Sequence, residues 1–234
     1  YNIWHGKHTE KLSEHWHSET ASFMGDSPTV QRFAVALFEG FTVLDVYGPV
    51  QAFASCRLPT GDGGFRRLYE IYSMAEHAGI VKSGEGPPSY AEYSFSAAPD
   101  YDILLIPGGF GTRAMVHNAA FMAQLSAASE RARVTATVCT GSALLARTGR
   151  LDGRPATSNK IAWNWVIQQG PRVRWMRQAR WVDDGNIITS SGVSAGIDMT
   201  LSLIARLQGL DMAHTSARNM EYRWHEEASD DPFA

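Results

Sequence analysis

Three short segments of the chain hold residue types that could carry out nucleophilic chemistry. Cys139 lies in the run Ala-Thr-Val-Cys-Thr-Gly-Ser at residues 136–142. Gly108 and Gly109 follow Ile-Pro, and Asp45 ends the run Phe-Thr-Val-Leu-Asp. A thiolate is a strong nucleophile, glycine lets a backbone amide come close to a reacting atom, and a carboxyl group can transfer a proton. These residues predict a cysteine site, provided that the fold brings the three segments together.

Cys139 is the candidate nucleophile because of its neighbours in the sequence. An apolar strand, a tight turn of small residues and then a helix is the order found in a nucleophile elbow, where a sharp turn presents one side chain at the edge of a sheet. The amides and the positive dipole end of the following helix would stabilise the thiolate, and Thr140 would add its own amide and hydroxyl. The alternative is a buried structural cysteine, the ordinary state of a free thiol.

The other two segments also have plain structural alternatives. Pro-Gly-Gly is a common turn, but beside Cys139 the amides of Gly108 and Gly109 would form an oxyanion hole. Asp45 could be the N-cap of the helix that follows it, or its carboxyl could reach the neighbouring strand end. In an apolar setting beside a thiolate the pKa of Asp45 would rise, so that it could hold a proton and later release it.

Alternating strands and helices determine where these segments lie. The pattern predicts strands at 32–38, 68–75, 102–107, 134–138, 173–183 and 187–191, a hairpin near 79–86, and helices at 46–56, 113–129, 141–148, 160–168, 195–208 and 211–224. Such alternation indicates one α/β domain over residues 30–234, with a mostly parallel sheet between layers of helices. In that fold the carboxyl ends of the strands share one edge, so Asp45, Gly108 and Cys139 are expected to meet there.

Residues 1–29 are expected to be a flexible or docking N-terminal extension. They are polar and contain His5, His8, His15 and His17. No cysteine joins these histidines in a closed metal-binding pattern, so we predict no metal site in this segment.

The composition excludes several functions. Lys+Arg 21 against Asp+Glu 24 gives a formal charge of -3, which is a poor match to a nucleic-acid-binding protein. No apolar run is long enough to span a membrane. Two cysteines cannot build a disulfide framework, which favours a reduced, cytoplasmic protein. We predict neither a metal nor another cofactor.

With these motifs in place, the chain resembles the ThiJ/PfpI superfamily, relatives of the class I glutamine amidotransferases. The likeness runs from about Arg32 to Leu210 and includes the stretches 107–109, 138–142, 156–160 and 189–198. Within the superfamily the chain is most similar to isocyanide (isonitrile) hydratases, which pair a Cys-Thr elbow with an Asp in an L-D-x-x-G-P segment; here this segment is 44–49. The resemblance implies a flavodoxin-like fold, a small-molecule substrate, no cofactor, and a homodimer with the site near the subunit interface.

The chain departs from other branches at three positions. Protease-like and glyoxalase-like members usually carry Glu in place of Asp45, and His after the cysteine or within the stretch matching 156–160. Here Thr140 and Asn159 stand instead, which argues against peptidase and glyoxalase chemistry. The histidines outside the extension, at 77, 117, 214 and 225, are expected to be surface or packing residues.

The resemblance implies a reaction in which the Cys139 thiolate attacks the isocyanide carbon, Asp45 donates a proton and an N-substituted formamide forms. The alternatives are a redox or stress-response thiol protein, glyoxalase-type action on methylglyoxal, and a ligand-sensing domain like those of AraC-type regulators. We expect no DNA-binding module here, because the residues after Leu210 are few and not basic.

Overall fold

The computed structural model describes residues 30–234, and the extension predicted at 1–29 lies outside this range. A seven-stranded sheet forms its centre. In spatial order the strands are β12 (Trp181–Asp183), β13 (Ile187–Ser190), β9 (Val134–Thr137), β8 (Ile103–Ile106), β1 (Gln31–Ala36), β4 (Tyr69–Ala75) and β7 (Tyr93–Ser94). Neighbouring strands are parallel except for β12 and β13, which are antiparallel. The predicted single α/β domain with a mostly parallel sheet is confirmed.

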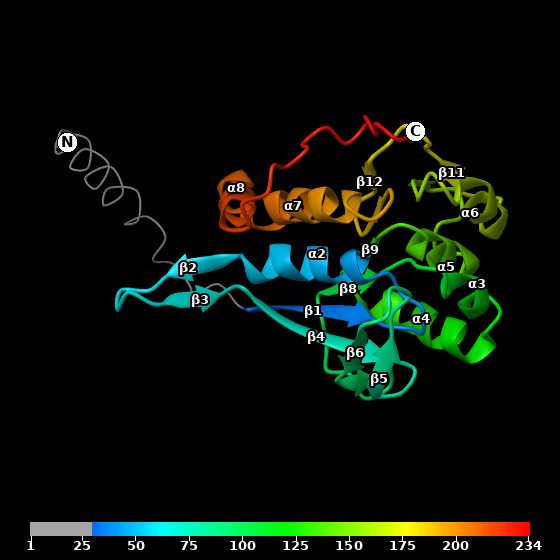
Figure 1. Cartoon of the computed structure of the whole chain (residues 1–234), viewed down its shortest axis with the longest axis horizontal. Coiled ribbons are helices and arrows are strands. Elements are labelled where there is room, and N and C mark those ends of the chain that lie inside the picture. Colours follow the sequence, from blue (N-terminus) through cyan, green and yellow to red (C-terminus); the bar gives the residue numbers. More distant parts are fainter. Residues whose placement is uncertain (1–29) are drawn as a thin grey trace.

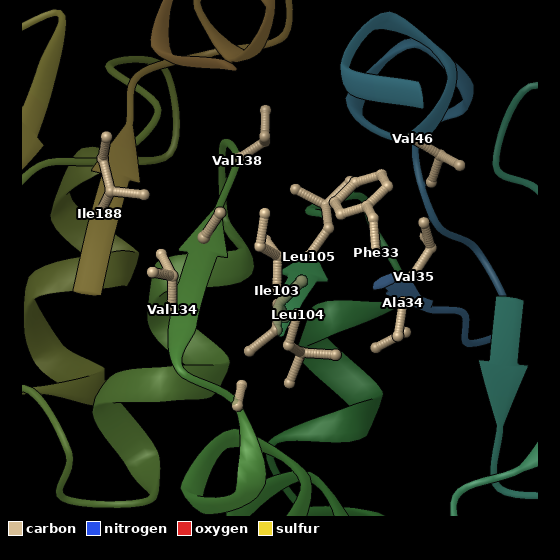
Figure 2. Close-up of a cluster of buried hydrophobic side chains, with 14 of the residues drawn as sticks. Phe33, Ala34, Val35, Val46, Ile103, Leu104, Leu105, Val134, Val138 and Ile188 are labelled. Carbon is tan, nitrogen blue, oxygen red and sulfur yellow. The ribbon is translucent and has the colours of Figure 1, made fainter. Parts of the chain in front are cut away.

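The central strands are buried on both faces, as their continuous apolar sequences require. Every residue of β8, β9 and β13 is buried. Figure 2 shows Phe33, Leu105, Val134 and Ile188 on neighbouring strands within one apolar cluster. Val138 extends this row beyond the end of β9, so the residue that precedes Cys139 is anchored in the core.

Helices cover both faces of the sheet (Figure 1). On one side lie α2 (Val43–Ala54), α7 (Ala195–Gln208) and α8 (Leu210–Asn219), and on the other α3 (Thr112–Met115), α4 (Ala119–Arg131) and α5 (Gly141–Arg147), with α6 (Trp163–Gln169) beside α5. The helix predicted at 113–129 is two helices. Asn118 separates them, because its side chain accepts a hydrogen bond from the amide of Phe121 and so caps α4.

Three pairs of short strands lie outside the central sheet. Strands β5 (Gly79–Lys82) and β6 (Pro88–Ala91) form the predicted hairpin, which is longer than expected. Strands β2 (Arg57–Pro59) and β3 (Phe65–Arg67) form a second hairpin, which sequence reasoning missed and which extends away from the sheet (Figure 1). The short strands β10 (Pro155–Ala156) and β11 (Arg174–Trp175) pair in parallel.

Residues 220–234, called here the C-terminal segment, have no regular secondary structure. The helix predicted at 211–224 ends at Asn219, and the segment then runs back over α7 toward β12 (Figure 1). It is tied down by polar contacts: the Trp224 indole donates to the Asp198 carbonyl at 3.1 Å, and the Arg180 amide donates to the Ala228 carbonyl at 2.8 Å. Among the described residues, no helix has the length and apolar character needed to cross a membrane.

Candidate active site

The three segments singled out in the sequence meet at the carboxyl edge of the sheet. Asp45 lies in the first turn of α2, Gly108 and Gly109 follow β8, and Cys139 follows β9. The Gly108 amide donates to Asp45 Oδ2 at 2.9 Å, and the Gly109 amide donates to Thr140 Oγ1 at 3.0 Å. The structure therefore brings all five predicted residues into one site.

Glycine is required where the loop after β8 touches the turn after β9. A Cβ on Gly108 would lie 2.5 Å from the Thr140 nitrogen and 2.8 Å from Cys139 Cβ. Gly109 has a φ of +130°, and a Cβ there would lie 2.3 Å from the Gly40 carbonyl oxygen. No larger residue fits at either position without moving the backbone. Gly108 therefore allows the loop after β8 to approach the turn after β9, and Gly109 allows it to approach the loop after β1.

Cys139 has an unusual backbone conformation. Its φ is +57°, in the left-handed region, which costs a residue with a Cβ about 1–2 kcal/mol. Two contacts fix this geometry: the Cys139 amide donates to the Ser191 carbonyl at 3.0 Å, and the Ser158 hydroxyl donates to the Cys139 carbonyl at 2.8 Å. The turn is thus held by loops that follow β10 and β13.

The Cys139 sulfur lies in a nearly closed environment. The residue is 6% exposed, and burial raises the pKa of its thiol to about 12, with a further upward contribution from the charge of Asp45. Hydrogen bonds from the amides of Thr140 and Val193, and from the Thr140 side chain, act in the opposite direction. The expectation that helix amides would give Cys139 a low pKa is therefore wrong for the isolated thiol, because desolvation outweighs them.

Val193 is a site residue that the sequence analysis missed. Its amide bonds the Cys139 sulfur, and its φ is +40°, which a β-branched residue rarely adopts. The stretch 189–198 was noted as a family motif, but nothing in its sequence indicates which amide turns toward the cysteine.

The glycine amides have other partners in this structure. The Gly108 amide donates to the Asp45 carboxyl group, and the Gly109 amide donates to the Thr140 hydroxyl oxygen. This hydroxyl oxygen also lies 3.2 Å from Thr112 Oγ1. The oxyanion role of Gly108 and Gly109 stays a prediction, and it requires these amides to exchange partners during a reaction.

Asp45 does not cap its helix, because Thr42 occupies the N-cap position. The Asp45 carboxyl is fully buried, and its Oδ1 makes no well-aligned hydrogen bond within residues 30–234. Burial raises the pKa of Asp45 to about 7, the charge of Glu85 raises it further, and hydrogen bonds from the Gly108 amide and with the Cys139 thiol lower it. This carboxyl can accept or release a proton near neutral pH.

Asp45 and Cys139 form a coupled pair, because each shifts the pKa of the other. The first proton leaves in a step near pH 7 that belongs to both groups. After this step one proton remains to be shared between a carboxyl and a thiol. The raised thiol pKa keeps this proton mainly on sulfur, and the amides of Thr140 and Val193 lower the free-energy cost of moving it to Asp45, which leaves the charge on sulfur.

Among residues 30–234, no histidine forms a hydrogen bond with Cys139. Asn159, in the place where other branches carry His, accepts a hydrogen bond from the Ala162 amide at 2.8 Å. No group of three or more His, Cys, Asp or Glu residues between 30 and 234 could hold a metal ion. The chemistry available here is that of a thiol, a carboxyl, a hydroxyl and backbone amides.

A surface cavity of about 450 Å³ lies away from this site. It is lined by Val116, His117, Ala119, Met122 and Arg147, none of which contacts the sulfur or the carboxyl. The cavity has no paired acid and nucleophile, so we place the candidate site at Cys139.

Comparison with known proteins shows which family the chain resembles in sequence and fold. The sequence profile of the DJ-1/PfpI family matches residues 31–206. The chain is 28% identical over 186 residues to an isonitrile hydratase from Pseudomonas putida, covering 80% of this chain and 76% of that enzyme. It is also 28% identical over 183 residues to the HTH-type transcriptional regulator GbdR from Pseudomonas aeruginosa, covering 78% of this chain and 48% of the regulator. A crystal structure of a ThiJ/PfpI family protein from Pseudomonas syringae superposes with a TM-score of 0.73 and 31% identity, covering 87% of this chain and 78% of that one.

The fold, the residues at the sheet edge and the sequence match define one class of protein: the chain belongs to the DJ-1/PfpI family.

Proposed function

We propose that the protein is an isonitrile hydratase-like enzyme, a hydro-lyase that joins water to an isocyanide and forms an N-substituted formamide. The observation that carries this proposal is the coupling of the buried Asp45 carboxyl, with a pKa of about 7, to a Cys139 sulfur that receives two backbone amides. The similarity to an isonitrile hydratase supports it.

The first step uses the singly protonated pair. The Cys139 sulfur attacks the terminal carbon of R–N≡C and forms a C–S bond. The proton held by Asp45 moves to the same carbon, giving the thioimidate R–N=CH–S–Cys139 and an Asp45 carboxylate. General acid catalysis of this kind contributes about 100- to 10,000-fold to a rate.

The second step uses water. The Asp45 carboxylate takes a proton from water as the water oxygen attacks the thioimidate carbon, and it passes this proton to the nitrogen. The tetrahedral adduct R–NH–CH(OH)–S–Cys139 then collapses: its hydroxyl gives its proton to Asp45, the C–S bond breaks, and R–NH–CHO leaves behind a Cys139 thiolate and a protonated Asp45. The sum is R–NC plus H₂O giving R–NH–CHO.

Thr140 and the glycines support these steps. The Thr140 amide stabilises negative charge on sulfur, and its hydroxyl would orient the sulfur or the water. The Gly109 amide would help to stabilise charge as it develops, after the Thr140 hydroxyl releases it. Loss of one such donor typically lowers a rate about 100- to 1,000-fold.

Isonitrile hydration does not require the histidine of a peptidase. A cysteine peptidase uses its histidine to protonate a departing amine, whereas here the nitrogen stays in the product. The site has an acid beside its nucleophile and no histidine in contact with it among the described residues. Its inventory therefore matches hydration better than amide cleavage.

The direct test is incubation of the purified protein with a simple aryl isocyanide, followed by ultraviolet absorbance, and in parallel with methylglyoxal. We expect repeated turnover of the isocyanide to the formamide and none of methylglyoxal. Turnover of methylglyoxal alone would favour the glyoxalase alternative and contradict the proposal.

Two non-enzymatic candidates share the same site. A redox thiol protein would oxidise Cys139 through a sulfenic acid to a sulfinic acid stabilised by the same amides, with two equivalents of a two-electron oxidant such as a peroxide consumed per thiol and no product released. A ligand-sensing domain is favoured by the match to a regulator of which this chain spans about half. Multiple turnovers per protein would exclude both as the main function.

We further propose a cytoplasmic homodimer acting on a small molecule, without nucleic acid or membrane partners. Phe110 and Ile161 follow the two site loops at Gly109 and Lys160, and they are 84% and 99% exposed. A second copy could cover this apolar surface. Sedimentation at micromolar concentration tests the expectation, and a monomer would contradict it.

A further inference from the structure

Charged side chains lie buried together beside the site. Lys160 and Arg180 have side chains 4% and 8% exposed, and those of Asp198 and Asp231 are fully buried. The Arg180 guanidinium lies 2.5 Å from Asp198 Oδ2 and 3.7 Å from Asp231 Oδ1, and Lys160 Nζ lies 3.4 Å from Asp231 Oδ2. Two cations thus face two carboxylates, and we call these four residues the buried cluster.

Asp231 comes to the cluster from the C-terminal segment. Its backbone amide donates to the Gln178 carbonyl at 2.9 Å, and the neighbouring contact between the Arg180 amide and the Ala228 carbonyl fixes the same segment. Asp231 Oδ2 has no hydrogen-bond partner within residues 30–234. Asp231 Oδ1 accepts a hydrogen bond from the Phe233 amide at 3.2 Å. A buried carboxylate with so few hydrogen bonds depends on the two cations beside it to offset the cost of its desolvation.

Lys160 carries the influence of Asp231 to the backbone of Cys139. Its ammonium donates to Thr157 Oγ1 at 2.9 Å, to the Ser158 carbonyl at 3.2 Å and to the Ala179 carbonyl at 2.9 Å. These bonds fix Ser158, whose hydroxyl donates to the Cys139 carbonyl. A single ammonium group therefore holds the loop that holds the cysteine.

Arg180 provides a second connection, to the backbone amide of Cys139. The Arg180 carbonyl accepts from the Ser191 amide at 2.8 Å, and the Ser191 carbonyl accepts from the Cys139 amide at 3.0 Å. Through its side chain, Arg180 also binds Asp198 in α7, the helix that begins two residues after Val193. Both loops that fix Cys139 are thus connected to the buried cluster.

We propose that Asp231 is a positioning residue for Cys139, acting through Lys160 and Arg180 on the loops at 157–159 and 191–193. The proposal rests on the role assigned above to Cys139. This role would make the C-terminal segment part of the active site, although no residue of that segment contacts the Cys139 sulfur or Asp45.

The test compares Asp231→Asn with a matched control in the full chain. The control is Asp183→Asn, which removes a partly buried ion pair with Arg206 at the far end of β12, away from the site. Thermal unfolding measures how much each change costs in stability. A purely structural role would lower the melting temperature of both variants and leave Cys139 chemistry intact in both.

Two measurements report on Cys139 itself. With an aryl isocyanide, we expect Asp231→Asn to lower kcat about 10- to 100-fold, the loss typical of a misplaced reacting group, with KM changed less than about twofold. Alkylation by iodoacetamide across pH, followed on the Cys139 peptide separately from that of Cys56, should show its midpoint moved upward, because the sulfur loses the Val193 amide. Asp45, the other titrating group that faces the sulfur, is intact in every variant.

Lys160→Met removes the ammonium group that connects Asp231 to the loop at 157–159, and it replaces Asp231→Asn in the test if that variant does not fold. Lys160→Met should lower kcat and raise the alkylation midpoint, as Asp231→Asn does. The fall in kcat of the double variant should be smaller than the product of the two single-variant falls, because both residues act through the same contacts. Asp231→Asn with a wild-type kcat and a wild-type alkylation midpoint would overturn the proposal. The alkylation arm needs no isocyanide, so it gives its answer even if the proposed activity fails.

Discussion

The two cysteines of this protein lie in similar burial but in different chemistry. Burial raises the pKa of both Cys56 and Cys139 to about 12. Cys56 is completely inaccessible and its thiol donates to the Ala52 carbonyl at 3.6 Å, one helical turn away. That sulfur gives its proton to a backbone acceptor, which stabilises the thiol form, and a hydrogen bond with the Ser216 side chain only partly opposes the rise in pKa.

Cys139 meets the opposite kind of group. Backbone amides of Thr140 and Val193 donate toward its sulfur, and a protonatable carboxyl stands beside it. Donors stabilise a thiolate, whereas acceptors stabilise a thiol. The comparison of Cys56 with Cys139 shows that burial alone does not identify a reactive cysteine. The direction of the hydrogen bonds around the sulfur distinguishes the two.

The strongest test of this contrast removes each sulfur by a Cys→Ala substitution. Cys139→Ala should abolish isocyanide turnover and labelling by an electrophilic isocyanide analogue, since the attacking atom is gone. Cys56→Ala should retain kcat within about twofold, because its sulfur only packs. Steady-state kinetics and mass spectrometry measure both, and full activity in Cys139→Ala would end the proposed mechanism.

Removing the acid should have the next largest effect. Asp45→Asn keeps the size of the side chain but cannot carry the proton, so kcat should fall about 100- to 10,000-fold. Asp62→Asn, an exposed aspartate on the turn between β2 and β3, is the matched control and should have wild-type kinetics. Equal kcat values for Asp45→Asn and wild type would remove Asp45 from the mechanism.

Thr140→Val should have a smaller effect on both activity and stability. The substitution leaves the buried Gly109 amide without its acceptor, which costs about 1–3 kcal/mol in the free energy of unfolding. It also removes the hydroxyl bond to the sulfur, which is not an oxyanion-hole donor; a hydrogen bond to a charged group worth about 1.5 kcal/mol corresponds to a fall in kcat of about tenfold. Chemical denaturation and kinetics check the two numbers, and an unchanged free energy of unfolding would contradict the role assigned to this hydroxyl.

The mildest change is one of pH. Because the reactive form holds one proton between Asp45 and Cys139, activity should be lost as pH falls through about 7, where the pair gains its second proton. The value of kcat/KM should then rise with pH and level off above this point. A profile that is flat between pH 5 and 8, or a midpoint near the ordinary pKa of about 4 for an aspartate, would contradict the coupling.

Local sequence patterns predicted the scaffold well, because they depend on neighbours along the chain. The bounds of α7 coincide with the helix predicted at 195–208, and Cys139 lies where the strand 134–138 was expected to end. The meeting of Asp45, Gly108 and Cys139 also followed from the sequence, since a parallel sheet gathers its strand ends at one edge.

What escaped prediction depends on contacts between distant residues. Val193 and Asp231 have no local signature, because their roles come from which loop folds against which. The pKa of Cys139 was predicted with the wrong sign for a related reason: helix amides can be read from the sequence, but the degree of burial that outweighs them cannot.

Chain ends are usually the part of a domain that tolerates deletion and fusion best. Residues 231–234 of this sequence are an exception, because Asp231, three residues before Ala234, is buried between two cations. A trim of only a few residues there would leave Lys160 and Arg180 facing each other without their shared counter-charge. Purification handles and reporter fusions are therefore better attached at the other end of the chain.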